Sequence, residues 1–290
     1  MLPLLLAAGY VFTEVFVPGA SVMSNFWGPN DKGQVILTSD IGDGVYKDGT
    51  FTPLPDPPAG YFVSPHGINN AGTIVGSAFA PPDFQEQGFI LTGSAYTFFS
   101  RPGWQFTEPR GIGNSGLVTG WNSEDASNRT AGFVYDPRTN SFTDATPPGS
   151  LFTITQGINK SGVISGSGRD ASTGTYAFIW QQGTFTKGKS VVPFIDRFEV
   201  ANRHARARGI NDTGIVVGYT DSTGFVGNSV RGFELLKVPG ATDMGLSTTF
   251  CEGINNSGQV TCGYIDDSFN FHAFIGSPRG GDDRDDDHDK

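Results

Sequence analysis

A six-residue unit, typified by Gly253-Ile254-Asn255-Asn256-Ser257-Gly258, occurs six times along the 290 residues of this chain. The first glycines of successive copies are 39 to 52 residues apart. A repeat of this length is typical of propellers, solenoids and related arrays, in which each repeat packs against its neighbours. The six copies are Gly28–Gly33, Gly67–Gly72, Gly111–Gly116, Gly157–Gly162, Gly209–Gly214 and Gly253–Gly258.

Each unit predicts a tight β-hairpin. Asn at the first turn position can hydrogen-bond its own backbone two residues further on, and Gly at the fourth position accepts a positive φ. Together they predict a three-residue loop, a type I turn followed by a G1 bulge. A two-residue turn would instead place Ile68 opposite Thr73. The three-residue loop pairs apolar residues: Ile68 with Ile74, Ile158 with Ile164, and Ile254 with Val260.

A second landmark follows each unit, 16 to 23 residues after its first glycine, and we interpret it as the third strand of the repeat. A short turn and an aromatic strand such as Ser141-Phe142-Thr143 follow in most copies. Four short strands per repeat form one blade of a β-propeller. The sequence therefore predicts an all-β, six-bladed β-propeller over residues 10–278. The landmarks are Gly44-Val45-Tyr46, Gly88-Phe89-Ile90, Gly132-Phe133-Val134, Ala177-Phe178-Ile179, Gly232-Phe233-Glu234 and Ala273-Phe274-Ile275.

The two ends of the repeat region complement each other. Residues 10–20 look like a fourth strand without the preceding three, and the last copy ends near Ile275 after three strands. If the N-terminal strand completes the last blade, the ring closes and an open sheet edge is removed. Residues 1–9 are apolar but too short to span a membrane, so we interpret them as a signal remnant or a docking arm. Residues 279–290, with six Asp, are predicted to form a solvated acidic tail.

Charge and loop length narrow the classes of partner. The formal net charge is −10, which argues against nucleic acid, because phosphate neutralisation needs Lys and Arg. The turns of the six units share one face, which we expect to be plain. Loops on the opposite face are longer and differ between blades, and the longest, residues 187–208, carries four arginines. We expect the binding surface on that opposite face.

The residue immediately before each unit is a candidate for ligand binding. Equivalent positions in a six-bladed ring surround the central axis, so these six side chains are expected to form a collar at the mouth of the tunnel. A mixed polar collar suits a small polar ligand or a sugar, with Trp27 as a stacking surface. Alternatively, they are ordinary strand residues that bridge adjacent blades. The collar consists of Trp27, His66, Arg110, Gln156, Arg208 and Glu252.

One Asp recurs in each loop between the second and third strands. A ring of carboxylates would offer Ca²⁺ the oxygen ligands that it prefers. Asp is also a common turn residue, and we favour this second explanation. No motif in the chain requires a cofactor. The six residues are Asp40, Asp83, Asp125, Asp170, Asp221 and Asp266.

The two cysteines, Cys251 and Cys262, flank the last hairpin. In the bulged register they are not directly opposite each other. The last copy reads Val260-Thr261-Cys262-Gly263 where other copies have glycine one position earlier, which suggests an extra residue that shifts the pairing. A disulfide requires Cα atoms within roughly 7 Å. Two buried thiols and a metal site are the alternatives, although the chain lacks Cys/His zinc spacing.

These motifs resemble the HAF-repeat family of extracellular bacterial proteins, named for the His-Ala-Phe present here at His272-Ala273-Phe274. The family pattern continues from Gly-Ile-Asn-x-x-Gly through His-(Ala/Gly)-Phe to a Pro-Gly-Ala. Pro18-Gly19-Ala20 and Pro239-Gly240-Ala241 supply this last element, and the resemblance covers residues 10–276. It implies secretion and a repeat fold, and it offers no catalytic residues to carry over.

We therefore expect a secreted, non-enzymatic propeller that binds an extracellular ligand such as a carbohydrate, or other protein chains. The apolar arm and the acidic tail suggest a subunit of an extracellular assembly, including a homo-oligomer. The alternative is a hydrolase or lyase that acts on carbohydrate at the propeller mouth. That alternative predicts a deep pocket at the collar with two carboxylates, or a pair such as His66 and Glu252.

Overall fold

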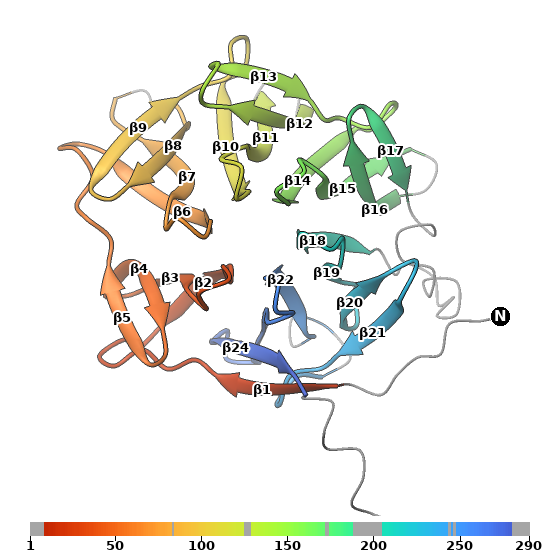
Figure 1. Cartoon of the computed structure of the whole chain (residues 1–290). Helices are drawn as coiled ribbons and strands as arrows, with labels where there is room; N and C mark the ends of the chain where they lie inside the picture. Colours follow the sequence, from red (N-terminus) through yellow and green to blue (C-terminus); the bar gives the residue numbers. More distant parts are fainter. Residues whose placement is uncertain are drawn as a thin grey trace, which may run out of the picture.

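The computed structural model describes residues 9–82, 84–124, 129–171, 174–187, 205–242, 245 and 248–279. They form six four-stranded antiparallel sheets arranged as a closed ring (Figure 1). The first strand of each sheet faces the central axis and the fourth lies at the rim (Figure 1). This arrangement confirms the predicted six-bladed β-propeller.

The strands of the first three blades follow one another in sequence. Blade 1 contains β2 (Met23–Trp27), β3 (Val35–Ser39), β4 (Gly42–Lys47) and β5 (Thr50–Pro53). Blade 2 contains β6 (Phe62–Ile68), β7 (Ile74–Phe79), β8 (Gln87–Thr92) and β9 (Ala95–Phe99). Blade 3 contains β10 (Phe106–Ile112), β11 (Val118–Glu124), β12 (Arg129–Asp136) and β13 (Ser141–Asp144).

Blades 4 and 5 are also continuous in sequence, whereas blade 6 takes its strands from both ends of the chain. Blade 4 contains β14 (Phe152–Ile158), β15 (Ile164–Asp170), β16 (Gly174–Gln181) and β17 (Thr184–Lys187). Blade 5 contains β18 (Arg206–Ile210), β19 (Val216–Tyr219), β20 (Gly224–Asn228) and β21 (Gly232–Leu236). Blade 6 contains β22 (Phe250–Ile254), β23 (Val260–Ile265), β24 (Phe271–Pro278) and, as its fourth strand, β1 (Tyr10–Glu14).

The turn of each unit has the predicted geometry. In blade 2 the N–H of Gly72 donates to Asn69 O at 3.0 Å, and Asn69 Oδ1 accepts the N–H of Ala71 at 3.0 Å. The fourth-position glycine has a positive φ in all six copies, for example 82° at Gly72. The structure also contains the expected strand pairs, which are Ile68 with Ile74, Ile158 with Ile164, and Ile254 with Val260.

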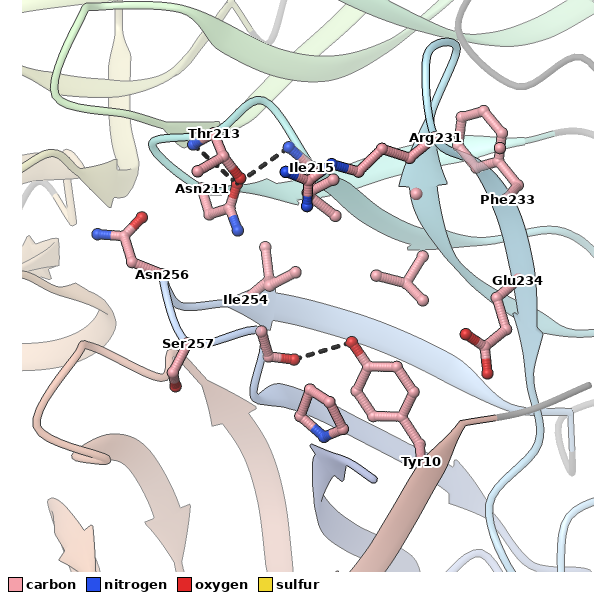
Figure 2. A pocket seen from close by; sticks show the side chains of 15 residues that line it. Tyr10, Asn211, Thr213, Ile215, Arg231, Phe233, Glu234, Ile254, Asn256 and Ser257 are labelled. Carbon is pink, nitrogen blue, oxygen red and sulfur yellow. Dashed lines mark hydrogen bonds between the residues drawn. The ribbon is translucent and has the colours of Figure 1, made fainter. Parts of the chain in front are cut away.

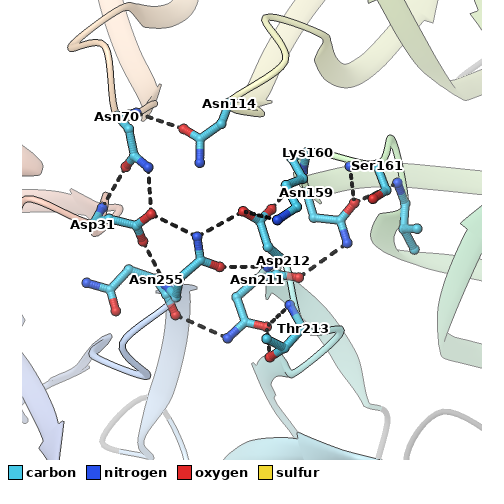
Figure 3. Close-up of polar contacts among 12 residues, drawn as sticks. Asp31, Asn70, Asn114, Asn159, Lys160, Ser161, Asn211, Asp212, Thr213 and Asn255 are labelled. Atoms are coloured by element: carbon cyan, nitrogen blue, oxygen red, sulfur yellow. Dashed lines mark hydrogen bonds and ion pairs between the residues drawn. The ribbon is translucent and has the colours of Figure 1, made fainter.

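The same Asn also joins neighbouring blades, a role that we did not predict. Asn211 Nδ2 donates to the backbone oxygen of Asn255 in the next blade at 3.1 Å (Figure 3). The residue that follows each Asn forms a second inter-blade link. The N–H of Asp212 donates to Asn256 Oδ1 at 2.8 Å, and the N–H of Asn256 donates to Asp31 Oδ1 at 2.7 Å. The unit therefore builds both the turn and the contact between turns.

The junction between blades 3 and 4 is stabilised differently. Gly113 replaces the Asn of the unit there, and Lys160 replaces the acceptor side chain that follows it elsewhere. Two threonines supply the contact instead. Thr119 Oγ1 lies 2.9 Å from Thr155 Oγ1, and the Thr155 hydroxyl donates to the backbone oxygen of Gly120.

A buried phenylalanine on the third strand packs against a glycine on the second strand in four blades. A Cβ added to Gly218 would lie 2.8 Å from the Phe225 ring, so the aromatic ring occupies the space that a side chain would need. All four phenylalanines are fully buried. The pairs are Gly76 with Phe89, Gly120 with Phe133, Gly166 with Phe178, and Gly218 with Phe225.

Our assignment of the third strand in blade 5 was wrong. That strand is β20, with Gly224-Phe225-Val226, whereas Gly232-Phe233-Glu234 lies in the fourth strand, β21. The blade contains two Gly-Phe steps, and spacing alone does not separate them. Packing distinguishes the two steps, because Phe225 is fully buried opposite Gly218. Phe233 lies on the outer strand, and its ring contacts the Phe225 ring edge-on with the centroids 5.9 Å apart.

Cys251 and Cys262 form a disulfide between β22 and β23, with a Cα–Cα distance of 3.9 Å. Contrary to our expectation they are directly opposite each other, because a β-bulge at Glu252 shifts the register. Our hypothesis of an extra residue was also wrong. Cys262 occupies the position at which the second strand has Gly218 in blade 5.

The N-terminal strand closes the ring as predicted. Strand β1 pairs with β24 over its whole length, with Thr13 opposite Ile275. His272 adds a polar contact across this pairing, since its Nδ1 lies 2.9 Å from Glu14 Oε1 and its Nε2 lies 3.3 Å from Asp266 Oδ2. Burial lowers the pKa of His272, but the hydrogen bonds to both carboxylates outweigh it, so the pKa lies above its usual value.

The two roles of the unit's Asn can be separated by substitution. Asn255→Asp keeps the oxygen that accepts the N–H of Gln259 at 2.9 Å, but it removes the amide that donates to Asn30 O at 3.0 Å. We expect the free energy of unfolding to fall by about 1–3 kcal/mol, because an acceptor is left unpaired beside a carboxylate. Asn140→Asp is the matched control, because among the described residues the Asn140 side chain accepts a hydrogen bond from the Tyr135 hydroxyl and donates none to another blade. Equal urea midpoints for Asn255→Asp and wild type would show that the inter-blade hydrogen bond contributes nothing to the free energy of unfolding.

The stability of the closed ring should depend on pH, because His272 contacts two carboxylates where β1 pairs with β24. Since its folded pKa is raised, the protonated ring stabilises the fold below about pH 6.5, and this contribution is lost as the pH rises through the folded pKa. The pair is partly exposed, so we expect less than about 1 kcal/mol. His272→Gln should lack this fall in melting temperature between pH 6 and 8. Parallel melting profiles for the two proteins would contradict the expectation.

Candidate functional site

The six collar residues do converge on the axis, where they line a cavity of about 90 Å³. In blades 2 to 6 the collar residue is the extra residue of a β-bulge in the first strand, as at His66 between Pro65 and Gly67. A bulge re-aims a side chain out of the ladder. In blade 1 the bulge lies earlier in the strand, and Trp27 is paired with Ile36.

The charged collar residues are bound to one another. The Arg208 guanidinium lies 3.0 Å and 2.8 Å from the two oxygens of Glu252, and it also donates to Gln156 Oε1. Arg110 pairs with Glu108 two residues earlier on its own strand. Burial raises the pKa of Glu252, and it raises the pKa of Glu108 to about 7. The positive and negative groups of the collar therefore largely balance.

His66 is buried and neutral. Burial and the nearby Arg110 charge lower its pKa to about 3. With a neutral ring, its Nδ1–H donates to Pro109 O at 2.8 Å, and its Nε2 accepts the Ser64 hydroxyl at 3.1 Å. Within the described part of the chain no hydrogen bond joins His66 to Glu252. The cavity is also far below the roughly 300 Å³ at which small-molecule pockets begin. The collar thus lacks the deep pocket that the enzyme alternative predicts.

The described members of the Asp set belong to four different blades: Asp40, Asp221 and Asp266 lie in loops, and Asp170 is the last residue of β15. Asp266 Oδ1 accepts the N–H groups of both Ser268 and Asn270 at 2.8 Å, and the hydrogen bonds from Asn270 lower the pKa of Asp266 to about 2. Asp40 accepts the N–H of Ser21 at 2.9 Å. Asp221 forms an ion pair with an arginine of its own blade. Asp83 and Asp125 lie outside the described residues, and among the described ones no three His, Cys, Asp or Glu residues group as a metal site.

A pocket of about 370 Å³ lies between blades 5 and 6 (Figure 2). Its walls include Thr213 and Ser257, which belong to the turns of two successive units. The pocket therefore opens on the face of the turns. We expected that face to be plain, and the structure shows instead that it is hollowed.

The floor of this pocket is apolar and its rim is charged. Ile215, Ile254 and Phe233 line it, together with Arg231 and Glu234, which both come from the β20–β21 region (Figure 2). Burial raises the pKa of Glu234, whose carboxylate accepts the N–H of residue 9. The exposed Arg231 forms no ion pair with any described residue.

Tyr10 brings the N-terminal strand into the same pocket. Its hydroxyl donates to Gly258 O at 2.9 Å (Figure 2). Burial and the neighbouring Glu234 raise the pKa of Tyr10 to about 12, so it is protonated at neutral pH. This pocket was not predicted from the sequence, because its parts are more than 200 residues apart and because the residues of β21 were assigned to the third strand of the blade. The available signal was the pair of charges that flank Gly232-Phe233, which no other blade has.

A larger groove of about 510 Å³ lies at the junction of blades 6 and 1, on the side opposite the turns. Glu14, His272 and Asn270 lie at its polar end, and the apolar side includes Phe16, which is 70 % exposed. This groove lies on the face where we expected binding. Of the long loop predicted to carry function, residues 188–204 lie outside the described part, as do residues 1–8 and 280–290.

No described helix is long and apolar enough to cross a membrane. The sequence matches no protein-family profile and no curated protein. The solved structures that are similar to this chain include the following three. AofleA from Arthrobotrys oligospora is 12 % identical, with a TM-score of 0.53 over 92 % of this chain and 86 % of that one. A sialidase from Trypanosoma rangeli, solved with the inhibitor DANA, is 9 % identical, with a TM-score of 0.50 over 94 % and 60 %.

The third is the lectin of Aleuria aurantia, described as a six-bladed β-propeller with a novel fucose recognition mode. It is 10 % identical, with a TM-score of 0.47 over 86 % of this chain and 89 % of that one. At such identities a structural likeness establishes the fold and leaves function to the site itself. The chain is thus a six-bladed β-propeller whose pockets must supply any functional argument.

Proposed function

We propose that this chain is a non-enzymatic, carbohydrate-binding propeller, and that the pocket between blades 5 and 6 is a sugar site. The observation that carries the proposal is the combination of an apolar floor with one arginine and one carboxylate in a single pocket (Figure 2). Its volume of about 370 Å³ falls within the usual range for small-molecule sites.

The chemistry of the pocket matches the two sides of a sugar ring. A pyranose has an apolar C–H face, which Ile215, Ile254 and Phe233 can cover, and hydroxyl groups around its edge. The planar guanidinium of Arg231 can donate two parallel hydrogen bonds, and the Glu234 carboxylate can accept two. Adjacent hydroxyl groups both donate and accept, so they fit such a pair.

The pocket is better suited to binding than to hydrolysis. Glycoside hydrolysis commonly uses a pair of carboxylates that flank the scissile bond. Glu234 is the one carboxylate among the described residues that line this pocket. A single acidic group can hold a sugar hydroxyl, and no second described carboxylate of the lining can act as its partner.

Secretion forms part of the same proposal. The Cys251–Cys262 disulfide supports an oxidising compartment, since such bonds are rare in the cytosol. The resemblance to extracellular HAF-repeat proteins supports it as well. Assembly with other chains remains a prediction that depends on the terminal segments outside the described residues.

The sugar site can be tested on the full chain by titration calorimetry against ligands chosen from a glycan array. We expect Arg231→Ala and Glu234→Gln each to weaken binding by about 10- to 100-fold, the value of hydrogen bonds to charged groups. Arg138→Ala is the matched control, because Arg138 lies in the equivalent turn of blade 3, where Asp136 binds it at 3.0 Å. It should bind as wild type does.

Three outcomes would overturn parts of the proposal. If the wild-type chain binds no glycan on the array, carbohydrate binding is wrong. If it binds but neither substitution matters, the pocket is wrong. Release of reducing sugar during incubation with a bound oligosaccharide would show that the protein is an enzyme.

A further inference from the structure

The collar contains buried hydrogen-bond donors that meet no acceptor among the described residues. Two of them are the indole N–H of Trp27 and the Nε–H of Arg110, and both residues line the axial cavity. Arg208 Nε and Glu252 Oε2 also lack a hydrogen bond, but these two atoms lie 2.8 Å apart and compensate each other as an ion pair. Buried polar groups are nearly always hydrogen-bonded in native proteins, so each exception needs an explanation. Two unpaired donors on one cavity indicate an acceptor that lies between them.

The acceptors of the collar are already in use. Glu252 Oε1 and the amide oxygen of Gln156 accept hydrogen bonds from Arg208. Glu252 Oε2 accepts none, but it forms an ion pair with Arg208 Nε at 2.8 Å. Glu108 binds Arg110, and both ring nitrogens of His66 have partners. The collar groups that have neither a hydrogen bond nor an ion-pair partner atom are therefore the two donors on Trp27 and Arg110, which suit an anion better than a cation.

The positive groups of the collar surround the same aromatic ring. The Arg110 guanidinium carbon lies 5.3 Å from the Trp27 ring centroid, and that of Arg208 lies 6.0 Å from it. Burial and the proximity of Arg208 both lower the pKa of Arg110, while Glu108 opposes them. An anion beside the two guanidinium groups would relieve their mutual repulsion.

We propose that the axial cavity binds one small monovalent anion, such as chloride or formate, through the Nε–H of Arg110 and the indole N–H of Trp27. The cavity of about 90 Å³ holds roughly three waters, so it accepts an ion of this size and excludes a sugar. The site is separate from the pocket between blades 5 and 6. An experiment that disproves the anion site therefore leaves the proposed sugar site untouched, and the reverse also holds.

The charge of the collar also gives the site a pH dependence. Burial raises the pKa of Glu108 to about 7, so this group loses its negative charge as the pH falls below neutrality. The other charged groups around it are Arg110, Glu86, Arg208 and Glu252. Binding of an anion should therefore be tighter at pH 6 than at pH 8.

The test measures the melting temperature of the full chain in sodium chloride, formate or gluconate at equal ionic strength, so that screening is constant. Gluconate is too large for the cavity. We expect a saturable rise in melting temperature with chloride and formate but none with gluconate. A net charge of −10 opposes general attraction of anions, so a saturable effect points to a local site.

Two substitutions make the result specific. Trp27→Phe removes the indole N–H and keeps an aromatic ring, so the apparent anion affinity should fall about tenfold, the value of one hydrogen bond to a charged group. Trp121→Phe removes another buried, unpaired indole N–H outside the collar and should leave the affinity unchanged. Glu108→Gln should retain binding and lose its dependence on pH.

The proposal fails on any of three results. These are equal melting temperatures in chloride and gluconate, equal anion responses of Trp27→Phe and Trp121→Phe, or a bromide-soaked crystal whose axial cavity shows water without an anomalous peak. The crystal experiment does not depend on how any variant folds. An anomalous peak beside Arg110 and Trp27 would support the site directly.

Discussion

The side-chain amide of the unit's Asn is the interaction on which the ring depends. Its oxygen closes the turn inside one blade, and its nitrogen donates to the backbone of the next blade, as from Asn255 to Asn30 between the last repeat and the first. This bond joins consecutive turns at five of the six junctions between blades, and at the junction of blades 3 and 4 the contact between Thr119 and Thr155 takes its place. Strand β1 completes the same closure at the rim, where it covers the edge that β24 would otherwise expose.

Close approach of the blades at the axis determines where ligands can fit. A Cβ added to Gly67 would lie 2.9 Å from Arg110 O in the next blade, so the first glycine of the unit permits the backbones to meet. The axis therefore holds a small polar cavity rather than a wide tunnel. Two cavities of ligand size lie further out, one between blades 5 and 6 and one between blades 6 and 1.

Both larger cavities adjoin the last blade, and both include residues of β1. Tyr10 lines one of them at the start of this strand, and Glu14 lines the other at its end. The repeat is most irregular here, because two distant parts of the chain meet and their side chains have no internal counterparts. Blades 2, 3 and 4 are alike and pack their third-strand phenylalanines in the same way, as Phe89 and Phe133 show.

The sequence by itself determined the fold and the residues at the axis. The unit's Asn and Gly predict one turn geometry, and six copies of that turn predict six blades. Position within the repeat was enough to place His66, Arg110 and Arg208 on the axis, since symmetry carries equivalent positions to the same place. The ring-closing role of residues 10–14 followed from a missing strand at one end and a spare one at the other.

Only the tertiary structure decided which charges pair and where a ligand-sized pocket forms. Nothing local shows that Arg208 binds Glu252, 44 residues away, or that Tyr10 and Glu234 share a pocket. The same applies to β20 and β21, where two Gly-Phe steps compete and burial of Phe225 selects one. A turn is specified by adjacent residues through backbone geometry. A pocket between blades depends on side chains that become neighbours only after the ring has closed.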